Sequence, residues 1–539
     1  MSATGLYPIT IGLQQGKTVV SQLVTFVERL GAKLTTPNTQ DDLRVALIGS
    51  LDGDVTRQSD SSTLISNNDR ASIAQTIASL EDLPTTPITL AIRPEFIEGL
   101  DRSTLEDGDL LVRLQSTQSL NILSNTYVDV NQALTDQSES IFTDQLRLGE
   151  DTLRRLLPTY KATRDIWFQQ TPLFEGGAQI LRNLGVRNVV MLREASQETK
   201  GAQVDRPPTG LVELQLPDGG VIDAAFVDIK LSAALTRGSQ NPRGGAYLVA
   251  QQILAELKML RSELNAEDFS TSDHGVLLST DSGVLPSTAM LTALRATLNA
   301  NSAITFVSLG DLLSTMTHEV KDGSRLTLDL AQDADVPSIS HQLFTQTQER
   351  VDAYTSMLAP GDAQATQWKD LLSVMPARTL SNTQRQSYVD AIWLQTFLLG
   401  EAISIPTSTT FTLGGRESSL RISLRNDNDY DVRVRVRLTS SKLTFSAAEQ
   451  VVLLPSGMTT SIEVPVVAKS NGSFPVSLQL FSPSGNVAVG RSTTLTARVN
   501  ALAGLGQLVT GLALLLLIIW WVYHLRRASR RKLNLTSEA

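Results

Sequence analysis

The chain has 539 residues, which is enough for about three or four domains of ordinary size, so one large core is not expected. Its net charge of −9 argues against nucleic acid as a partner, because proteins that bind nucleic acid need basic patches to displace counterions. Cysteine is absent, which excludes disulfide bonds, cysteine nucleophiles and metal sites with cysteine ligands.

The first residues, 1–15, contain no basic start, no apolar core and no small-residue cleavage site of a secretory signal. We interpret residues 1–40 as a linker or as the end of an upstream β-rich domain. The end of the chain, by contrast, points to an exported protein. We therefore expect an N-terminus that is truncated relative to the natural chain and has lost its signal peptide.

Between residues 41 and 335, short apolar runs alternate with longer stretches of helical spacing. This alternation is typical of parallel strands joined by crossover helices and predicts an α/β region, a distorted β/α barrel. The predicted strands are 43–48, 88–92, 120–123, 165–168, 189–192, 224–229, 275–278 and 304–307. The predicted helices are 70–80, 139–156, 172–184, 245–264 and 285–299.

The strand pattern stops at residue 336, and apolar residues recur at helical spacing up to residue 402. We interpret this part as a helical segment, a spacer pair of helices that packs against the barrel. Residues 403–499 then alternate apolar and polar side chains between turn sequences. Such alternation is typical of half-buried antiparallel strands and predicts an all-β immunoglobulin-like sandwich.

One strand of the predicted sandwich carries three arginines on a single face, Arg433, Arg435 and Arg437, while Val432, Val434, Val436 and Leu438 fall on the other. The arginine face has two interpretations. It is a solvated sheet face, which we favour, or a surface for an anionic polymer or a lipid headgroup.

Residues 500–525 predict a transmembrane helix, because about 20 consecutive apolar residues cross the hydrocarbon core of a bilayer. Residues that prefer the membrane interface close this segment: Trp520, Trp521, Tyr523, Arg526, Arg527, Arg530, Arg531 and Lys532. Basic residues are retained in the cytoplasm, so residues 526–539 are predicted to form a basic cytoplasmic tail. The chain is then a single-pass protein of the plasma membrane with an extracytoplasmic ectodomain. A tail-anchored protein of the reverse topology is opposed by the five basic charges.

Candidate catalytic residues are acidic side chains near the ends of the predicted strands: Glu95, Asp129, Glu194, Asp228 and Asp281. Two carboxylates that face one cleft can hydrolyse a glycosidic bond, one as the acid and the other as nucleophile or base. Spacing along the chain does not show which of them converge. Acidic residues at strand ends also serve solubility and helix capping, and this is the more ordinary interpretation.

Metal and cofactor chemistry has little support in the sequence. The four histidines, His274, His318, His341 and His524, form no closely spaced pair, whereas a hydrolytic zinc site needs three protein ligands. The sequence also has no Gly-x-Ser-x-Gly elbow and no phosphate-binding glycine loop. We therefore expect no metal and no other cofactor.

Several segments together resemble an uncharacterised actinobacterial family of membrane-anchored envelope proteins encoded beside the lipid II flippase MurJ. They include GLYP at residues 5–8, TPITLAIRPEF, LNILSNTYVDVNQAL, RDIWFQQTPLFEGGAQILRNLGVRNVVM and NDNDYDVRVRVRL, followed by the membrane anchor. The resemblance covers nearly the whole chain through diffuse patterns. It implies a domain of unknown function whose middle region is similar to the barrels of polysaccharide deacetylases and glycoside hydrolases.

The resemblance also implies a set of residues at the mouth of the barrel, Asn125, Tyr127 and Trp167 together with Glu95 and Asp129. Deacetylases of this type have an Asp-Asp pair and a His-x-x-x-His metal motif, and this sequence has neither at an equivalent place. Deacetylase activity is therefore not carried over.

These observations favour a cell-envelope protein whose barrel is non-catalytic and binds a glycan or a protein partner. The membrane is the expected partner, with a cell-wall glycan or the lipid II flippase as further candidates and a role near lipid II export or peptidoglycan assembly. The alternatives are an envelope glycoside hydrolase with paired carboxylates and a purely structural surface protein. Whether the chain is an enzyme stays open.

Overall fold

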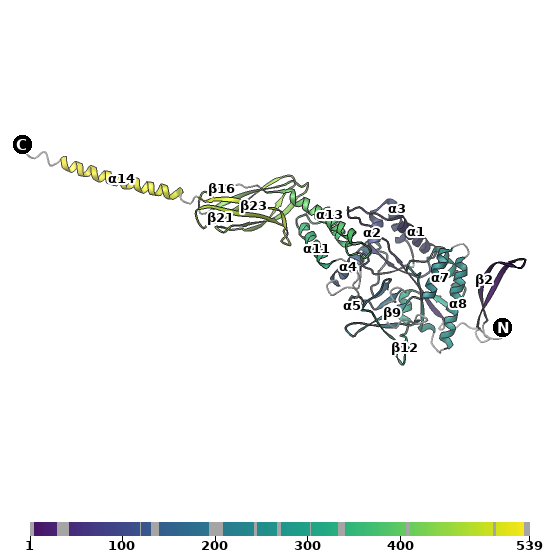
Figure 1. Ribbon diagram of the computed structural model, residues 1–539. Helices are drawn as coiled ribbons and strands as arrows, with labels where there is room; N and C mark the ends of the chain where they lie inside the picture. The colour runs from purple at the N-terminus through teal and green to yellow at the C-terminus, as the bar shows by residue number, and fades with distance from the viewer. Residues whose placement is uncertain are drawn as a thin grey trace, which may run out of the picture. The chain divides into compact units, whose positions relative to one another are not determined.

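The structure of the protein is a computed structural model that describes residues 5–29, 42–118, 120–130, 139–192, 208–241, 245–266, 271–301, 303–332, 340–405, 410–415, 417–499 and 503–532. The chain divides into two compact units (Figure 1). The first consists of Met1–Phe344 and Ser373–Tyr388, and the second of Thr345–Leu372 and Val389–Ala539. The first unit is therefore built from two separate stretches of the chain.

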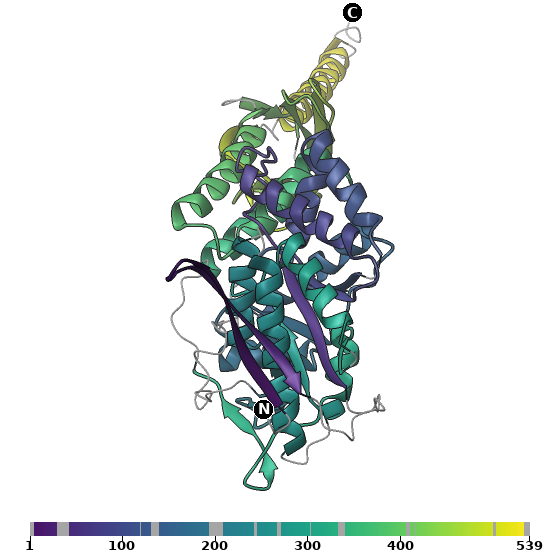
Figure 2. The same cartoon turned by 90° about the vertical axis from the view of Figure 1, so that its right-hand side faces the viewer.

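An antiparallel ribbon begins the first unit, made of β1 (Gly5–Gln15) and β2 (Thr18–Arg29). Gly16 lies in the turn with a φ of 66°, a left-handed conformation that glycine adopts without steric cost. The ribbon contacts α8 (Gly245–Ala266), as Figure 2 shows. The described part of the predicted segment 1–40 is therefore mostly strand.

Two five-stranded sheets follow in the first unit, and most of their strands run parallel. The first has the order β10–β3–β4–β5, with β11 also paired to β3. Its strands are β3 (Leu43–Leu51), β4 (Ile88–Ile92), β5 (Leu120–Leu123), β10 (Gly275–Leu278) and β11 (Ile304–Phe306). The second has the order β14–β8–β9–β7–β6, and its β8 and β9 are antiparallel. Its strands are β6 (Ile166–Gln169), β7 (Asn188–Met191), β8 (Val212–Gln215), β9 (Val221–Phe226) and β14 (Thr327–Asp329).

Single parallel bridges join the two sheets into a ring. Leu123 pairs with Thr163, which connects β5 to the segment before β6, and Val227 pairs with Leu277, which connects the segment after β9 to β10. Every residue of β4, β6 and β10 is buried, as expected for parallel strands that are covered on both faces. The first unit is therefore a mixed α/β fold of barrel-like arrangement.

Alternate residues of β3 show the two sides of this barrel-like sheet. Val45 and Leu47 belong to an outer core between the strands and the helices, whereas Ala46 and Ile48 belong to a second core inside the ring. The period of two along a strand places successive side chains in these two different cores.

Helices cover the outside of the ring, and several begin with a hydroxyl or carboxylate cap. Ser66, Thr104, Asp228, Ser287 and Ser308 each accept a hydrogen bond from the backbone N–H three residues later. The helices are α1 (Asn67–Asp82), α2 (Pro94–Arg102), α3 (Leu105–Gln115), α4 (Glu139–Leu156), α5 (Glu175–Asn183), α7 (Ile229–Gln240), α8, α9 (Thr288–Asn299) and α10 (Leu309–Thr315). Short elements complete this part: a 3-10 turn (Thr271–Asp273), β12 (Val320–Lys321) and β13 (Ser324–Arg325).

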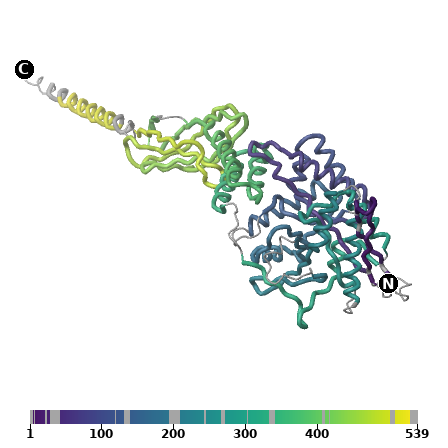
Figure 3. Tube along the Cα trace, turned by 45° about the vertical axis from the view of Figure 1, so that its right-hand side comes forward, coloured from purple at the N-terminus to yellow at the C-terminus, as the bar shows by residue number. Residues whose placement is uncertain are grey.

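Three helices follow, α11 (His341–Thr355), α12 (Ala363–Val374) and α13 (Asn382–Glu401). The chain after α13 is rich in sheet, and Figure 3 traces its extended segments in green and yellow. One sheet has the order β15–β17–β21–β19 and the other β16–β23–β22–β18–β20. Their strands are β15 (Ile403–Ser404), β16 (Thr410–Leu413), β17 (Glu417–Asn426), β18 (Val432–Thr439), β19 (Leu443–Phe445), β20 (Glu449–Leu454), β21 (Thr459–Ala468), β22 (Gly472–Phe481) and β23 (Ala488–Val499).

The last described element is α14 (Ala503–Lys532). Within the described part of the chain, its residues Leu508–Arg527 form the one helix that is long and apolar enough to cross a membrane. The apolar side chains between 508 and 525 are exposed, which is unfavourable in water and suits a lipid environment. The chain therefore has one candidate single-pass anchor.

Candidate functional site

A cavity of about 420 Å³ lies where strands of the first unit end. In parallel β/α barrels, the loops after the carboxyl ends of the strands form the ligand site, so this cavity is the candidate functional site. The lining residues are Asp52, Gly53 and Asp54 after β3; Arg93 after β4; Asn125, Thr126, Asp129 and Val130 after β5; Trp167, Phe168, Gln169, Gln170 and Thr171 around the end of β6; Ser282 after β10; Asp69 in α1; and Arg378 and Thr379.

A buried arginine binds two of the aspartates in this cavity. The Nη2 atom of Arg93 lies 2.9 Å from Oδ2 of Asp52 and 3.6 Å from Oδ1 of Asp129. Burial disfavours the charged guanidinium, but the carboxylates of Asp52 and Asp129 outweigh it and raise the pKa of Arg93. The two aspartates, which follow β3 and β5, are thus held on one cation that follows β4, the strand between them.

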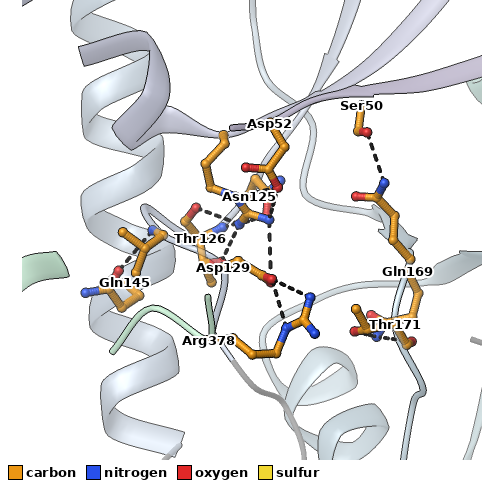
Figure 4. A network of polar contacts seen from close by, with 12 residues as sticks. Ser50, Asp52, Asn125, Thr126, Asp129, Gln145, Gln169, Thr171 and Arg378 are labelled. Carbon is orange, nitrogen blue, oxygen red and sulfur yellow. Dashed lines mark hydrogen bonds and ion pairs between the residues drawn. The ribbon is translucent and has the colours of Figure 1, made fainter. Parts of the chain in front are cut away.

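Neutral groups complete the surroundings of this arginine. Nη1 of Arg93 donates to the amide oxygen of Asn125 at 2.9 Å and to the hydroxyl of Thr126 at 3.0 Å. Asp129 also binds Arg378, whose Nη2 lies 2.7 Å from Oδ2 of the aspartate. Figure 4 shows Asp52, Asn125, Asp129 and Arg378 directed toward one another. This wall of the cavity is therefore a fixed polar network.

Amides and an indole form the opposite wall. Nε1 of Trp167 donates to the side chain of Gln169 at 2.9 Å, and Gln169 donates in turn to the carbonyl oxygen of Thr171 at 2.8 Å. Nε2 of Gln170 donates to the hydroxyl of Ser50 at 2.9 Å. The indole of Trp167 also packs against Phe142, with ring centroids 5.7 Å apart. These contacts fix the amide groups that border the cavity.

Only one of the described candidate acids lines the cavity, namely Asp129. Glu95 is buried in the first turn of α2 and accepts hydrogen bonds from the backbone N–H and the hydroxyl of Thr56 and from the N–H of Arg57. Burial is the main cause that raises the pKa of Glu95, against these hydrogen bonds. Glu95 therefore holds the loop that follows β3 and does not face the cavity.

The remaining candidate acids lie elsewhere. Asp228 is the N-cap of α7 and accepts from the N–H of Leu231 at 2.9 Å. Asp281 is exposed in a turn, where its N–H donates to the hydroxyl of Thr236 at 3.0 Å. Neither lines the cavity, and Glu194 lies outside the described residues. The structure thus does not bring the described candidate acids together.

Of the residues proposed for the barrel mouth, some line the cavity and others do not. Asn125 and Trp167 line the cavity, together with Asp129. Tyr127 is buried, and its hydroxyl donates to Oε2 of Glu98 at 2.6 Å, away from the cavity lining. The functions of these residues stay predictions.

The membrane-interface residues lie on α14. Trp520, Trp521 and Tyr523 are exposed, as are Arg526 and Arg527 one turn later. The side chains of Arg530, Arg531 and Lys532 lie outside those that the structure describes.

Three charged residues of the polar network were not predicted: Asp52, Arg93 and Arg378. Arg93 directly follows the predicted strand 88–92, and Asp52 directly follows β3, which extends three residues beyond the predicted strand 43–48. Position at a carboxyl end was therefore an available signal for both. Arg378 lies 249 residues from Asp129 along the chain, and no sequence pattern links them.

The four aspartates of the cavity lining do not form a group with the spacing of metal ligands. Among the described residues, the one such group is Glu213, Asp223 and His318, and none of these lines the cavity.

Comparisons with known proteins place part of the chain in a family. Residues 247–530 match a family described as a family of unknown function (DUF6049). The search of curated proteins finds no match.

Among solved structures, a 4-α-glucanotransferase from Thermococcus litoralis is similar with a TM-score of 0.42 and 11% identity, over 81% of this chain and 87% of that one. An α-mannosidase from Enterococcus faecalis V583 is similar with a TM-score of 0.40 and 10% identity, over 84% of this chain and 64% of that one. A PapD-like domain of human CEP192 matches 19% of this chain and 86% of its own, with 13% identity and a TM-score of 0.14.

Proposed function

We propose that this chain, which belongs to the family of unknown function DUF6049, is a membrane-anchored protein that binds a hydroxyl-rich ligand such as a glycan in its strand-end cavity. The observation that carries the proposal is the lining of that cavity. Amide, carboxylate and guanidinium groups from separate loops converge there and are held in place by one another. The function is binding, not catalysis.

Such a lining suits a ligand with many hydroxyl groups. Carboxylates and amide oxygens accept hydrogen bonds, whereas guanidinium and amide N–H groups donate them, and a hydroxyl needs both. Because the groups are fixed before a ligand arrives, little side-chain entropy is lost on binding. Asp54 is exposed on the lining and Gln170 is half-buried, so both are accessible to a ligand.

Hydrolysis has weaker support. A glycosidase needs one carboxyl group as an acid and another as a base or nucleophile, about 5 to 10 Å apart. Asp52 and Asp129 come close enough, since both contact the same Nη2 atom of Arg93. That shared guanidinium already engages both carboxylates, so neither is placed as a free acid.

The proposal also includes the cellular location and the membrane orientation of the protein. The basic residues that follow the aromatic end of α14 favour a cytoplasmic tail, so the cavity faces the extracytoplasmic side of the plasma membrane. We also propose that the alternating strands of the second unit form an immunoglobulin-like sandwich. We propose a cell-wall glycan as the ligand and, from the family resemblance alone, an association with the lipid II flippase and a role near peptidoglycan assembly.

Binding of soluble peptidoglycan fragments to the full-length protein in detergent, measured by calorimetry, tests the proposal. Asp54→Ala and Gln170→Ala should each weaken binding by about tenfold or more, because each removes a hydrogen bond worth about 1.5 kcal/mol. Gln179→Ala on α5 is the matched control, because Gln179 does not line the cavity. Absence of binding, or equal binding by all variants, would contradict the proposal.

Protease added to intact cells tests the orientation separately. The part of the chain before Arg498 should be digested. Full protection of that part would show that the chain has the reverse orientation in the membrane.

A further inference from the structure

Away from the cavity, three side chains with metal-binding atoms meet on the second sheet. Glu213 on β8 and Asp223 on β9 are direct cross-strand partners. His318 follows α10. Its backbone forms a parallel bridge with Leu211, the residue just before β8. One ligand atom from each of the three side chains lies within 4.8 Å of the others. All three are half-buried, so the group is fixed by the sheet and still open to an ion.

The placement of two carboxylates opposite each other needs a cation. Like charges on directly paired strand positions repel, and this lowers stability. In the structure Nε2 of His318 lies 2.9 Å from Oδ1 of Asp223, and Nη1 of Arg325 lies 2.8 Å from Oε1 of Glu213. Each carboxylate thus has one nitrogen partner, and a divalent ion between them would compensate both at once.

We propose that Glu213, Asp223 and His318 form a binding site for a divalent transition metal ion, for which zinc is the best fit. An imidazole nitrogen with carboxylate oxygens is a common zinc set, whereas calcium and magnesium take oxygen ligands alone. Zinc–ligand bonds of about 2.1 Å place ligand atoms about 3.4 Å apart in a tetrahedral site, so small side-chain movements suffice.

The role of the ion follows from its position. None of the three ligands lines the strand-end cavity, and Asp223 lies in the first half of β9, whereas the cavity gathers at strand ends. The ion therefore stabilises the fold: it ties the antiparallel pair β8–β9 to the chain after α10. This inference stands independently of the proposed glycan binding.

Arg325 is the competitor for this site. Its guanidinium occupies one oxygen of Glu213, but its side chain is 61% exposed, on the short hairpin of β12 and β13. An exposed arginine can leave the carboxylate at little cost. Removal of Arg325 should consequently strengthen metal binding, whereas removal of a ligand should weaken it.

The experiment uses the full-length protein in detergent, stripped with a chelator and titrated with zinc against a fluorescent zinc indicator. One equivalent of zinc should bind, and His318→Ala and Asp223→Asn should each weaken binding by at least about tenfold. Arg325→Gln should bind zinc more tightly than the wild type. Cobalt added in place of zinc should give visible absorption bands that disappear in His318→Ala.

His341→Ala is the matched control, because it removes a histidine outside the cluster and should bind like the wild type. Zinc should also raise the melting temperature of the wild type and of Arg325→Gln, but not of His318→Ala. Absence of zinc binding by the wild type would overturn the proposal. So would unchanged affinity in the ligand variants, or weaker binding in the folded Arg325→Gln protein.

Discussion

Arg93 at the strand-end cavity and Arg437 on β18 both bind carboxylates, but in different surroundings. Arg93 is 7% exposed and contacts Asp52, Asp129 and Asn125. Arg437 lies on an open sheet face, where it pairs with Glu449 and its guanidinium lies 4.2 Å from the ring centroid of Phe481. The comparison teaches that burial and the number of partners, and not the density of arginines in the sequence, decide what an arginine contributes.

The same contrast extends along β18. Arg435 binds Asn486 and lies 3.7 Å from Glu449, and Arg433 donates to the carbonyl oxygen of Leu358. The three arginines of the predicted ladder therefore have partners within the second unit. These contacts do not test whether the arginine face is a solvated sheet face or a surface for an anionic polymer or a lipid headgroup, so both interpretations stay predictions.

Substitution of Arg93 should have the largest effect. Arg93→Ala leaves the carboxylates of Asp52 and Asp129 without their shared cation. The expected loss is about 3 kcal/mol, the lower end of the cost of breaking a buried pair, because the side chains of the two aspartates are 33% and 24% exposed. Chemical denaturation of the full-length protein measures this loss. Arg437→Ala is the comparison variant, and a similar loss in both would abolish the distinction between the two regions.

Asp107 gives an intermediate case that depends on pH. Its buried carboxylate binds Nε of Arg70 at 2.6 Å, and this hydrogen bond is the main cause that lowers its pKa to about 2. A lowered pKa stabilises the fold above the unfolded value of about 3.9, and that stability is lost as the pH falls from about 4 through about 2.

Asp107→Asn should therefore lower the free energy of unfolding at pH 7 by about 2 kcal/mol. It should also flatten the dependence of stability on pH between about 4 and 2, as followed by circular dichroism. Glu106→Gln removes an exposed acid from the same helical turn and serves as the control. Equal pH profiles for Asp107→Asn and the wild type would refute the assignment.

The smallest effect is expected on the sheet face. A double-mutant cycle of Arg437→Ala and Glu449→Ala should give a coupling energy of about 0.2 to 1 kcal/mol, because both side chains are partly exposed, at 29% and 42%. Added salt should reduce the coupling further. A coupling above about 2 kcal/mol would place this pair in the class of Arg93.

The sequence predicts the strands of the barrel-like region well where they are continuous apolar runs. The runs at 88–92, 120–123 and 275–278 coincide with β4, β5 and β10, because most of their residues are apolar and buried, Asn121 of β5 being the one exposed exception. β8 was not predicted, since four residues that alternate between buried and half-buried positions give too short a pattern. The predicted strand 224–229 extends too far, because Asp228 caps α7.

The cavity was predictable only in part, for a related reason. Asn125, Trp167 and Asp129 belong to segments at strand ends, and position along a strand can be read from the sequence. Glu95 has a similar position, but it turns into the loop after β3 because Thr56 and Arg57 offer it three donors. Which way a side chain turns depends on such distant partners, and a single sequence does not show them.

The return of the chain to the first unit between Ser373 and Tyr388 has a consequence for biosynthesis. Arg378, which binds Asp129, and Tyr388, whose hydroxyl donates to the carbonyl oxygen of Arg57 at 2.5 Å, are translated long after the strands they contact. The ribosome must therefore extend the nascent chain past residue 388 before all of these contacts around the cavity can form. A gene fragment that stops at codon 344 would encode most of the barrel-like region but would lack Arg378 and Thr379 of the cavity lining.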